Sequence, residues 1–382
     1  MILLVEIQCK DWEHTSVNAG MIRLLSKAFP DEKIVFHAEE KHINCVREIT
    51  NQYQIEFDAK SLEFIDWRKE SVEKAEEYYK LLEAIVAKES EIDKMIILSC
   101  NKGIMISINQ LARKYSTVNF YLVLHSALED VFHKMSLFDF CYQKYYHLLH
   151  EKRWYKNISM KKCMNNCNRS NCRFIIYSPC YTKALKGIIR KKVINKIVFL
   201  HHPYYDYQGT NKENDYEKVN IGIYGQAVNE NAQRIVECYS NKYDNGKVNF
   251  QVMAREDNPI LKLKNVSRLF KNNYVSSEEL REAIQNMDYV LIPYNKSQYR
   301  VTASGIFWDA ISQEIPLLML DSPYFDYYAE RNVGIIKDNI DEIALCISQL
   351  NREKDCLFAE NEKKMKQCTF EENVKKLQMM CK

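Results

Sequence analysis

The segment from Asp288 to Leu320 constrains the fold more than any other part of the chain. Its apolar run Tyr289-Val290-Leu291-Ile292 has the length of a buried strand and ends at Pro293. A polar loop follows, and Ser304-Gly305 then begins a helical pattern that runs to about Ser312 before a second apolar run. Free backbone N–H groups and the positive end of the helix dipole gather where such a helix begins. The segment therefore predicts a phosphate site at the carboxyl end of a parallel strand.

Strand-sized apolar runs alternate with helical patterns along the whole chain, which is typical of parallel α/β layers. No internal repeat of fixed period is visible. The expected strands are Ile2–Ile7, Ile34–His37, Met95–Ser99, Phe120–His125, Phe174–Tyr177, Lys196–Leu200, Val219–Tyr224, Val248–Met253 and Tyr289–Ile292. The expected helices span about Asn18–Ala28, Ser71–Lys88, Ile104–Tyr115, Asn231–Tyr239, Ile306–Ser312, Asp341–Leu350 and a charged tail from Phe358.

At 382 residues the chain exceeds what one hydrophobic core usually supports. The polar, turn-rich stretch Tyr204–Lys218 reads as a linker. We expect an N-terminal Rossmann-like domain over 1–205 and a C-terminal domain over 206–360. The last segment, 361–382, is expected to form a C-terminal helix.

The same C-terminal stretch resembles the donor-binding core of family 4-like glycosyltransferases with the GT-B fold. That family shows "D-hydrophobic-hydrophobic-P", a variable loop, Ser-Gly or Glu-Gly, a helix and a short return to the next strand. The matching positions here are Asp288, Val290–Pro293, Thr302, Ser304-Gly305, Asp309 and Ile315-Pro316-Leu317. The resemblance implies an α/β protein of two Rossmann-like domains whose parallel sheets face each other across a cleft. It also implies that the last helix crosses back to the first domain.

The resemblance also implies a donor site in the C-terminal half. Ser304 and Gly305 N–H groups would hold a diphosphate, Thr302 would add a hydroxyl, and Asp309 would accept hydrogen bonds from ribose. Asp309 is equally explained as an acidic residue that favours a helix N-terminus. The further donor-binding residues are Gly225 in the loop after the first strand of this half, Arg255 or Arg300 as the cation, and Tyr274-Val275 beside the base. A capping box of Ser276 or Ser277 with Glu279 explains the residues after Val275 equally well.

In the N-terminal half, the loop from Trp12 to Gly20 follows the first strand and is expected to face the acceptor. His14 is a candidate catalytic base, with Glu13 as the alternative, and Asn18 and Gly20 are candidate acceptor-binding residues. The competing interpretation is an ordinary helix cap made by Thr15, Ser16 or Asn18.

His125 is the second catalytic candidate, because it stands at the carboxyl end of a buried strand. A histidine bonded to a neighbouring carbonyl explains it as well. His201-His202 repeats the pattern near the linker; adjacent histidines point to opposite sides of a strand, so a joint metal site is not expected.

These features predict a glycosyltransferase of the hexosyltransferase type. It would move a sugar from a nucleoside-diphosphate sugar to a hydroxyl of a glycan or lipid-linked saccharide, in surface polysaccharide synthesis. No Asp-x-Asp motif stands in a suitable loop, so neither a metal nor another cofactor is expected. Two alternatives stay open: a nucleotide-sugar epimerase with two Rossmann-like domains, and a non-catalytic binding subunit of a polysaccharide-synthesis assembly.

The net charge and the apolar runs limit which partners and which cellular location are expected. The net charge of +3 argues against a dedicated nucleic-acid binder. The start of the chain reads as a first strand rather than a signal peptide, and a cytoplasmic location is expected. The basic stretch Lys183–Lys196 is either a helix resting on the inner face of an anionic membrane or a solvated basic face.

Thirteen cysteines are scattered along the chain, which is typical of reduced thiols in the cytoplasm. Cys163, Cys167, Cys172 and Cys180 form the one cluster, and their spacings do not match paired CxxC zinc motifs. We expect a solvent-exposed loop of free thiols, with a zinc or redox role as the alternative.

Overall fold

The computed structural model describes residues 1–65, 74–89, 91–132, 158–204, 218–271, 275, 277–294, 300–350 and 356–380. The chain divides into two compact units. The first comprises Met1–Pro203, Val301–Ala303 and Glu372–Lys382, and the second comprises Tyr204–Arg300 and Ser304–Glu371. Most of the expected linker, 205–217, lies outside the described residues. The predicted cleft stays a prediction.

The first unit is built on a parallel sheet of seven strands in the order β3-β2-β1-β4-β5-β6-β7. The strands are β1 (Ile2–Val5), β2 (Ile34–Ala38), β3 (Asp58–Ser61), β4 (Lys94–Ile97), β5 (Asn119–Leu124), β6 (Cys172–Ile176) and β7 (Ile197–Phe199). The inner strands are apolar on both faces because helices cover both sides of the sheet. The strand order reverses between β1 and β4, so the loops that follow these two strands flank a crevice position of the kind where α/β folds bind ligands.

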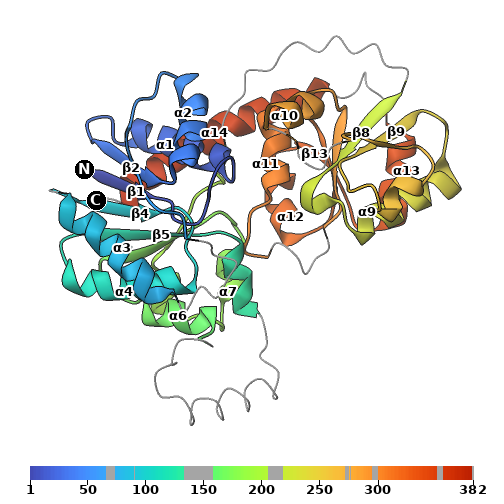
Figure 1. Cartoon of the computed structure of the whole chain (residues 1–382). Coiled ribbons are helices and arrows are strands. Elements are labelled where there is room, and N and C mark those ends of the chain that lie inside the picture. Colours follow the sequence, from blue (N-terminus) through green and yellow to red (C-terminus); the bar gives the residue numbers. More distant parts are fainter. Residues whose placement is uncertain are drawn as a thin grey trace. The chain divides into compact units, whose positions relative to one another are not determined.

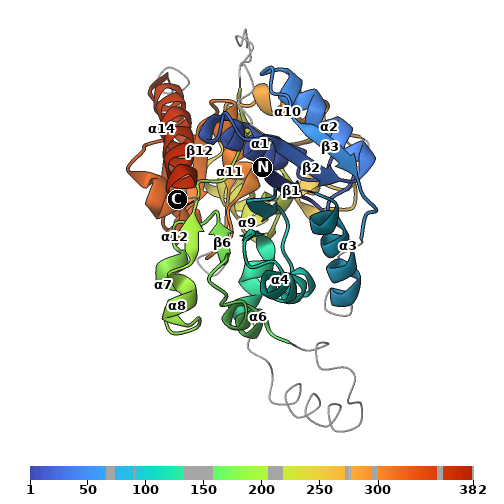
Figure 2. The same cartoon turned by 90° about the vertical axis from the view of Figure 1, so that its left-hand side faces the viewer.

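The helices of the first unit lie in two layers (Figures 1 and 2). One layer holds α1 (Thr15–Ala28) and α2 (Glu40–Asn51), and the other holds α3 (Ala75–Lys88), α4 (Lys102–Lys114) and α6 (Met160–Asn166). The 3-10 helix η1 (Ser126–Phe132) follows β5. The last turns of α14 (Cys356–Met380) also belong to this unit. There Asn373 exchanges two hydrogen bonds with the His201 backbone, at 2.7 and 2.8 Å.

The basic stretch Lys183–Lys196 does not form one helix, so that expectation is wrong. It contains the end of α7 (Tyr181–Leu185), an isolated bridge between Lys186 and Ile189, and α8 (Lys191–Ile194). Gly187 separates the two short helices with a φ of 78°, a left-handed conformation that ends a helix. Membrane contact through these residues stays a prediction, without the amphipathic helix that motivated it.

The second unit has six parallel strands in the order β10-β9-β8-β11-β12-β13. The strands are β8 (Val219–Ile223), β9 (Val248–Val252), β10 (Val266–Arg268), β11 (Tyr289–Ile292), β12 (Leu317–Leu320) and β13 (Gly334–Lys337). This order is that of a dinucleotide-binding Rossmann fold, with the reversal between β8 and β11. Asp288 of the recognised motif fixes this central pair, because its carboxylate accepts a hydrogen bond from the Asn220 N–H at 2.8 Å.

The helices of the second unit also form two layers. One holds α9 (Glu230–Cys238), continued by the π-helical turn η3 (Tyr239–Tyr243), and α13 (Ile340–Ser348). The other holds α10 (Ser277–Gln285), α11 (Gly305–Ser312) and α12 (Pro323–Ala329) (Figure 1). Short 3-10 turns, η2 (Gly225–Ala227) and η4 (Pro259–Lys262), follow β8 and β9. Among the described residues, no helix is both long and apolar enough to cross a membrane.

Candidate functional site

The N-terminus of α11 lies at the carboxyl end of β11, beside the point where the strand order of the second unit reverses. Ser304 caps the helix: its buried hydroxyl accepts a hydrogen bond from the Phe307 N–H at 3.2 Å. No described residue accepts a hydrogen bond from the N–H of Gly305 or Ile306. Gly305 is exposed, and a Cβ atom placed on it would meet nothing within 4 Å. The helix start therefore has two free donors, the positive end of the helix dipole and an exposed first residue, and an anion is favoured there.

Gly225 lies next to this helix. Its φ of 54° is left-handed, and a Cβ atom there would come within 3.3 Å of Ile306 Cδ1. Both the left-handed backbone and the small clearance favour glycine where the loop after β8 approaches the first turn of α11. Gly225 and Gly305 come from loops that follow the two central strands, and together they leave the backbone open around the helix start.

Asp309, in the second turn of α11, is half-buried, and Tyr224, directly before Gly225, is buried. Burial raises the pKa of Asp309 to about 7. Burial raises the pKa of Tyr224 well above its usual value, and the charges of Asp309 and Tyr294 raise it further. The Tyr224 hydroxyl is buried without a hydrogen-bond partner among the described residues. An Asp309 carboxyl that is partly protonated at neutral pH can both donate and accept hydrogen bonds, which an ordinary exposed aspartate at a helix start does not do.

The other predicted donor residues are spread more widely. Arg255 is exposed in the loop after β9, and Val275 is half-buried before α10. Tyr274 lies outside the described residues. In the loop between β11 and α11, Arg300 is the last residue before Val301 that belongs to the second unit, whereas Thr302 belongs to the first unit.

Thr302 lies in the three-residue segment that the first unit holds. Val301 is buried in the first unit's core, and its N–H donates to Glu129 Oε1 at 2.8 Å. The Thr302 hydroxyl is buried and has no hydrogen-bond partner within the described ranges. The spacing of residues in the sequence did not show that Val301–Ala303 belongs to the first unit, whereas Ser304 belongs to the second.

A pocket of about 430 Å³ opens at the carboxyl ends of β11, β12 and β13. Tyr294 lines it and connects it to α11, because the Ser304 hydroxyl lies 3.4 Å from the Tyr294 hydroxyl. The charged residues of the lining, among those that the structure describes, are Arg234, Asp321, Asp338 and Asp341. Carboxylates accept hydrogen bonds from hydroxyl groups and repel phosphate, so this pocket suits an uncharged group that carries hydroxyls.

In the first unit, four rings gather at the carboxyl edge of the sheet. The His125 ring centroid lies 5.2 Å from that of His14, 4.9 Å from Tyr177 and 6.1 Å from His202. Tyr177 and His202 are themselves 5.2 Å apart. Their residues follow β1, β5, β6 and β7, so the parallel topology brings together side chains that are far apart in sequence. We call His14, His125, Tyr177 and His202 the histidine cluster.

His125, His202 and Tyr177 are uncharged at neutral pH. Burial lowers the pKa of His125 well below its usual value, and the charges of His14 and His202 lower it further. Burial lowers the pKa of His202 to about 3. Burial also raises the pKa of Tyr177, and the Glu6 charge raises it further. The Tyr177 hydroxyl and His202 Nδ1 are buried, and no described residue forms a hydrogen bond with either. Two unpaired buried polar atoms beside the low-pKa imidazoles of His125 and His202 are uncommon in a folded protein, which makes this edge of the sheet a candidate site.

His14 stands at the N-terminus of α1 in a left-handed conformation, with a φ of 55°, and its side chain makes no capping bond. Thr15 and Asn18 lie inside the helix and bond to the Trp12 carbonyl and to His42, so neither is the cap that the alternative proposed. His201 and His202 have different surroundings: His201 Nε2 lies 2.8 Å from Glu372, whereas His202 joins the histidine cluster.

Two predicted acceptor residues lie within α1 instead of in the loop before it. The Asn18 amide is 2.8 Å from His42 Nε2, and His42 Nδ1 is 2.9 Å from the Asp11 carbonyl. Since a carbonyl only accepts, His42 donates through Nδ1 and accepts from Asn18 through Nε2. Gly20 is buried in the second turn of α1. The helix begins at Thr15, three residues before its expected start at Asn18, and the acceptor-binding role of Asn18 and Gly20 stays a prediction.

Glu6 is a residue that the sequence interpretation missed. It directly follows β1, is fully buried and accepts hydrogen bonds from the Gln8 and Cys9 N–H groups and from the Ser99 hydroxyl at 2.6 Å. These bonds fix the loops after β1 and β4, between which the strand order reverses. A lone acidic residue directly after an apolar run was the available signal.

The cysteine cluster is not an exposed loop, so that expectation is wrong. Cys163, Cys167 and Cys172 are free and buried in the core of the first unit, and Cys180 is half-buried. Burial raises the pKa of Cys163 to about 12, which keeps that thiol protonated. In the part of the chain that the structure describes, no group of three or more His, Cys, Asp or Glu side chains is arranged to hold a metal ion.

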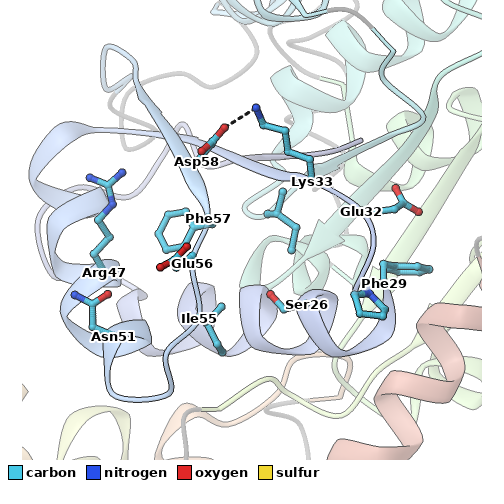
Figure 3. A pocket seen from close by; sticks show the side chains of 12 residues that line it. Ser26, Phe29, Glu32, Lys33, Arg47, Asn51, Ile55, Glu56, Phe57 and Asp58 are labelled. Atoms are coloured by element: carbon cyan, nitrogen blue, oxygen red, sulfur yellow. Dashed lines mark ion pairs between the residues drawn. The ribbon is translucent and has the colours of Figure 1, made fainter.

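A further hollow of the first unit lies at the amino edge of the sheet, with a volume of about 480 Å³ (Figure 3). Within the lining, Lys33 pairs with Asp58 at 2.6 Å, and Arg47 lies over the Phe57 ring at 5.7 Å. Carboxylates of Glu32 and Glu56 also line it. This balance favours no particular ligand charge.

No protein-family model matches the sequence, and no curated protein does. Solved structures resemble it over almost the whole chain. The lipopolysaccharide outer core galactosyltransferase WaaB, in its apo form, has a TM-score of 0.57 at 11% identity, with 97% of each chain covered. UDP-GlcNAc 2-epimerase from Neisseria meningitidis bound to UDP-GlcNAc has a TM-score of 0.54 at 12% identity, with 95% of this chain and 94% of that chain covered. The glycotransferase of kitacinnamycin has a TM-score of 0.53 at 11% identity, with 98% and 95% covered.

Together with the two parallel sheets, these likenesses show that the chain has the GT-B fold. The α/β class and the two Rossmann-like units predicted from the sequence are confirmed. Several activities share this fold, so function has to be argued from the sites.

Proposed function

We propose that this protein is a glycosyltransferase that uses a nucleoside-diphosphate sugar as its donor. The observation that carries the proposal is the open start of α11, where the free N–H groups of Gly305 and Ile306 lie beside the Gly225 loop at the reversal point of the second sheet. A diphosphate is the anion that a nucleotide-sugar site must hold, and a helix N-terminus supplies both donors and a favourable dipole for it.

The remaining contacts of the donor follow from the chemistry of the second unit. Asp309 would bond to donor hydroxyls, and the acidic pocket beside Tyr294 would take the hydroxyl-rich part of the sugar. Arg255 or Arg300 would supply the cation for the diphosphate. In this proposal, backbone dipoles and one arginine stabilise the departing diphosphate, without an obligatory metal and without another cofactor.

The histidine cluster would bind the acceptor. His14 is the proposed base that takes the proton of the acceptor hydroxyl, since it is exposed and its ring is in contact with that of His125. His125 stays neutral and would hydrogen-bond to the same hydroxyl, with Tyr177 and His202 offering their unpaired atoms to neighbouring hydroxyls. The proposed acceptor is a glycan or a lipid-linked saccharide of surface polysaccharide synthesis, used at the inner face of the membrane.

A nucleotide panel tests the donor site. We would measure the melting temperature of the full chain with UDP, GDP, ADP, CDP and TDP and with the corresponding monophosphates. A single diphosphate at about a hundred times its Kd should add about 2.7 kcal/mol of stability, and its monophosphate should add less. No stabilisation by any diphosphate would contradict the proposal. The stabilising base then selects the donor sugars to assay for transfer.

The epimerase alternative is supported by the likeness to the UDP-GlcNAc 2-epimerase structure. It predicts that the matching sugar nucleotide changes its configuration with no acceptor present, which NMR of the donor would detect. The transferase predicts no such change and a release of diphosphate that depends on acceptor. A binding subunit, the third alternative, predicts neither reaction.

A further inference from the structure

A pocket of about 380 Å³ lies in the first unit between α4, α6 and the loop that leads to β6. Among the described residues, its polar lining contains two arginines and four amide side chains, and no carboxylate: Arg113, Arg169, Asn109, Gln110, Asn166 and Asn168. Met105, Ile106, Ile158 and Cys163 supply the apolar part of the lining. This composition differs from that of the acidic pocket at the carboxyl edge of the second unit.

The pocket is separate from the histidine cluster. Arg113 is in the last turn of α4, shortly before β5 begins, and Arg169 is three residues before β6 begins. All strands of a parallel sheet begin at the same edge, so both arginines lie at the amino edge. His14 and His125 follow the ends of β1 and β5 and lie at the opposite, carboxyl edge.

Both arginines are available to a ligand. Neither Arg113 nor Arg169 forms an ion pair or a side-chain hydrogen bond within the described ranges, and both are exposed. The Asn109 side-chain oxygen is buried and accepts no hydrogen bond from any described residue. A ligand that satisfies all three groups carries an anionic group for the guanidiniums and a hydroxyl donor for the asparagine.

The surrounding charge favours an anion as well. From Ile158 to Pro203 the sequence contains no aspartate or glutamate. Its basic residues are Lys161, Lys162, Arg169, Arg173, Lys183, Lys186, Arg190, Lys191, Lys192 and Lys196. The Arg190 N–H donates to Asn165 in α6 at 3.0 Å, so the basic residues of α8 and α6 share one region of the surface. Such a field raises the local concentration of anions around the pocket.

We propose that this pocket binds a small phosphorylated polyol of the chemical class of sugar phosphates. The phosphate lies between Arg113 and Arg169, a hydroxyl donates to Asn109, and the carbon skeleton rests on Met105 and Ile106. The same chemistry occurs in a free sugar phosphate and in the inositol phosphate headgroup of a lipid.

Isothermal titration with glucose 1-phosphate tests the proposal. The variant Arg113→Gln/Arg169→Gln removes two charges from the pocket, and Lys191→Gln/Lys192→Gln removes the same number from α8, outside the pocket. Glucose 1-phosphate should bind the wild type and the α8 control alike, and the pocket variant at least tenfold more weakly. Asn109→Leu should weaken glucose 1-phosphate severalfold and leave inorganic phosphate unchanged.

Two controls separate this site from the others. Gly305→Glu places a negative charge at the start of α11; if it abolishes glucose 1-phosphate binding while the pocket variant does not, the proposal is overturned. Equal losses in the pocket variant and the α8 control would also overturn it, because the charge field alone would then explain binding. Phosphatidylinositol in phosphatidylcholine vesicles tests the lipid source: association that the pocket variant loses supports the proposal, with or without binding of the free sugar phosphate. No binding of either probe by the wild type refutes it.

Discussion

Replacing Gly305 by glutamate puts a carboxylate at the first position of α11, where the free N–H groups would hold a diphosphate. The site tolerates a side chain, because a Cβ atom at Gly305 meets nothing within 4 Å. In the ligand-free protein the added charge sits at the positive end of the helix dipole and should stabilise the fold by about 0.3–1 kcal/mol at low ionic strength. The same charge should oppose a bound diphosphate, so stability and binding change in opposite directions.

The size of the binding loss follows from electrostatics. At an effective dielectric constant of about 20, two unit negative charges about 5 Å apart repel by about 3 kcal/mol, which weakens binding by about two orders of magnitude. A diphosphate concentration about a hundred times the wild-type Kd then adds about 2.7 kcal/mol to the wild type and only about 0.4 kcal/mol to the variant. For a unit of this size, the rise in melting temperature falls from about 5–10 °C to about 1 °C.

Thermal melting with and without the stabilising diphosphate is the assay, and Gly305→Gln is the matched control. Glutamine has nearly the size of glutamate and no charge, so Gly305→Gln should keep most of the ligand-induced rise. If Gly305→Glu responds to the diphosphate as strongly as the wild type, the anion does not bind at α11. If glutamine abolishes the response as fully as glutamate, bulk rather than charge decides binding, and the electrostatic argument fails.

Three further changes test the fold and the buried groups. Burial raises the pKa of the Asp309 carboxyl from its ordinary 3.8 to about 7. Between about pH 4 and pH 7 the folded protein therefore holds a proton that the unfolded chain has released, so the free energy of unfolding should fall as the pH rises through this range. Asp309→Asn should remove this pH dependence of the unfolding free energy, which amounts to up to about 4 kcal/mol in denaturant melts. An unchanged pH dependence would refute the raised pKa of Asp309. Gly334→Ala puts a Cβ atom 2.2 Å from the Leu317 carbonyl oxygen and should destabilise the second unit by about 3 kcal/mol. Gly305→Ala is the control and should cost nothing, because its Cβ atom meets no other atom within 4 Å. If the two variants are equally stable, the close contact between Gly334 and Leu317 is contradicted. Asn18→Leu leaves buried His42 Nε2 without its donor and should cost about 1–3 kcal/mol in the same melts, and a variant as stable as the wild type would show that this hydrogen bond is unimportant.

Features that depend on a few neighbouring residues were readable from the sequence. The strand Tyr289–Ile292 and the helix beginning at Gly305 lie where the apolar run and the Ser-Gly step predicted them. Their signals are local, because a buried parallel strand needs a short apolar run and a helix start needs a capping side chain. Weakly apolar elements were not predicted. The edge strand β3, Asp58–Ser61, is mostly exposed and polar, so no apolar run marks it.

The sequence alone thus determined the α/β class and the open helix start at Ser304-Gly305, since these follow from periodicity and backbone preference. Tertiary structure decided which distant side chains meet. His14, His125, Tyr177 and His202 come together because β1, β5, β6 and β7 end at one edge of the same sheet. It also decided that Asp309 is buried enough to raise its pKa and that Cys163 lies in a core, because burial depends on strand order and on the layers that cover each face.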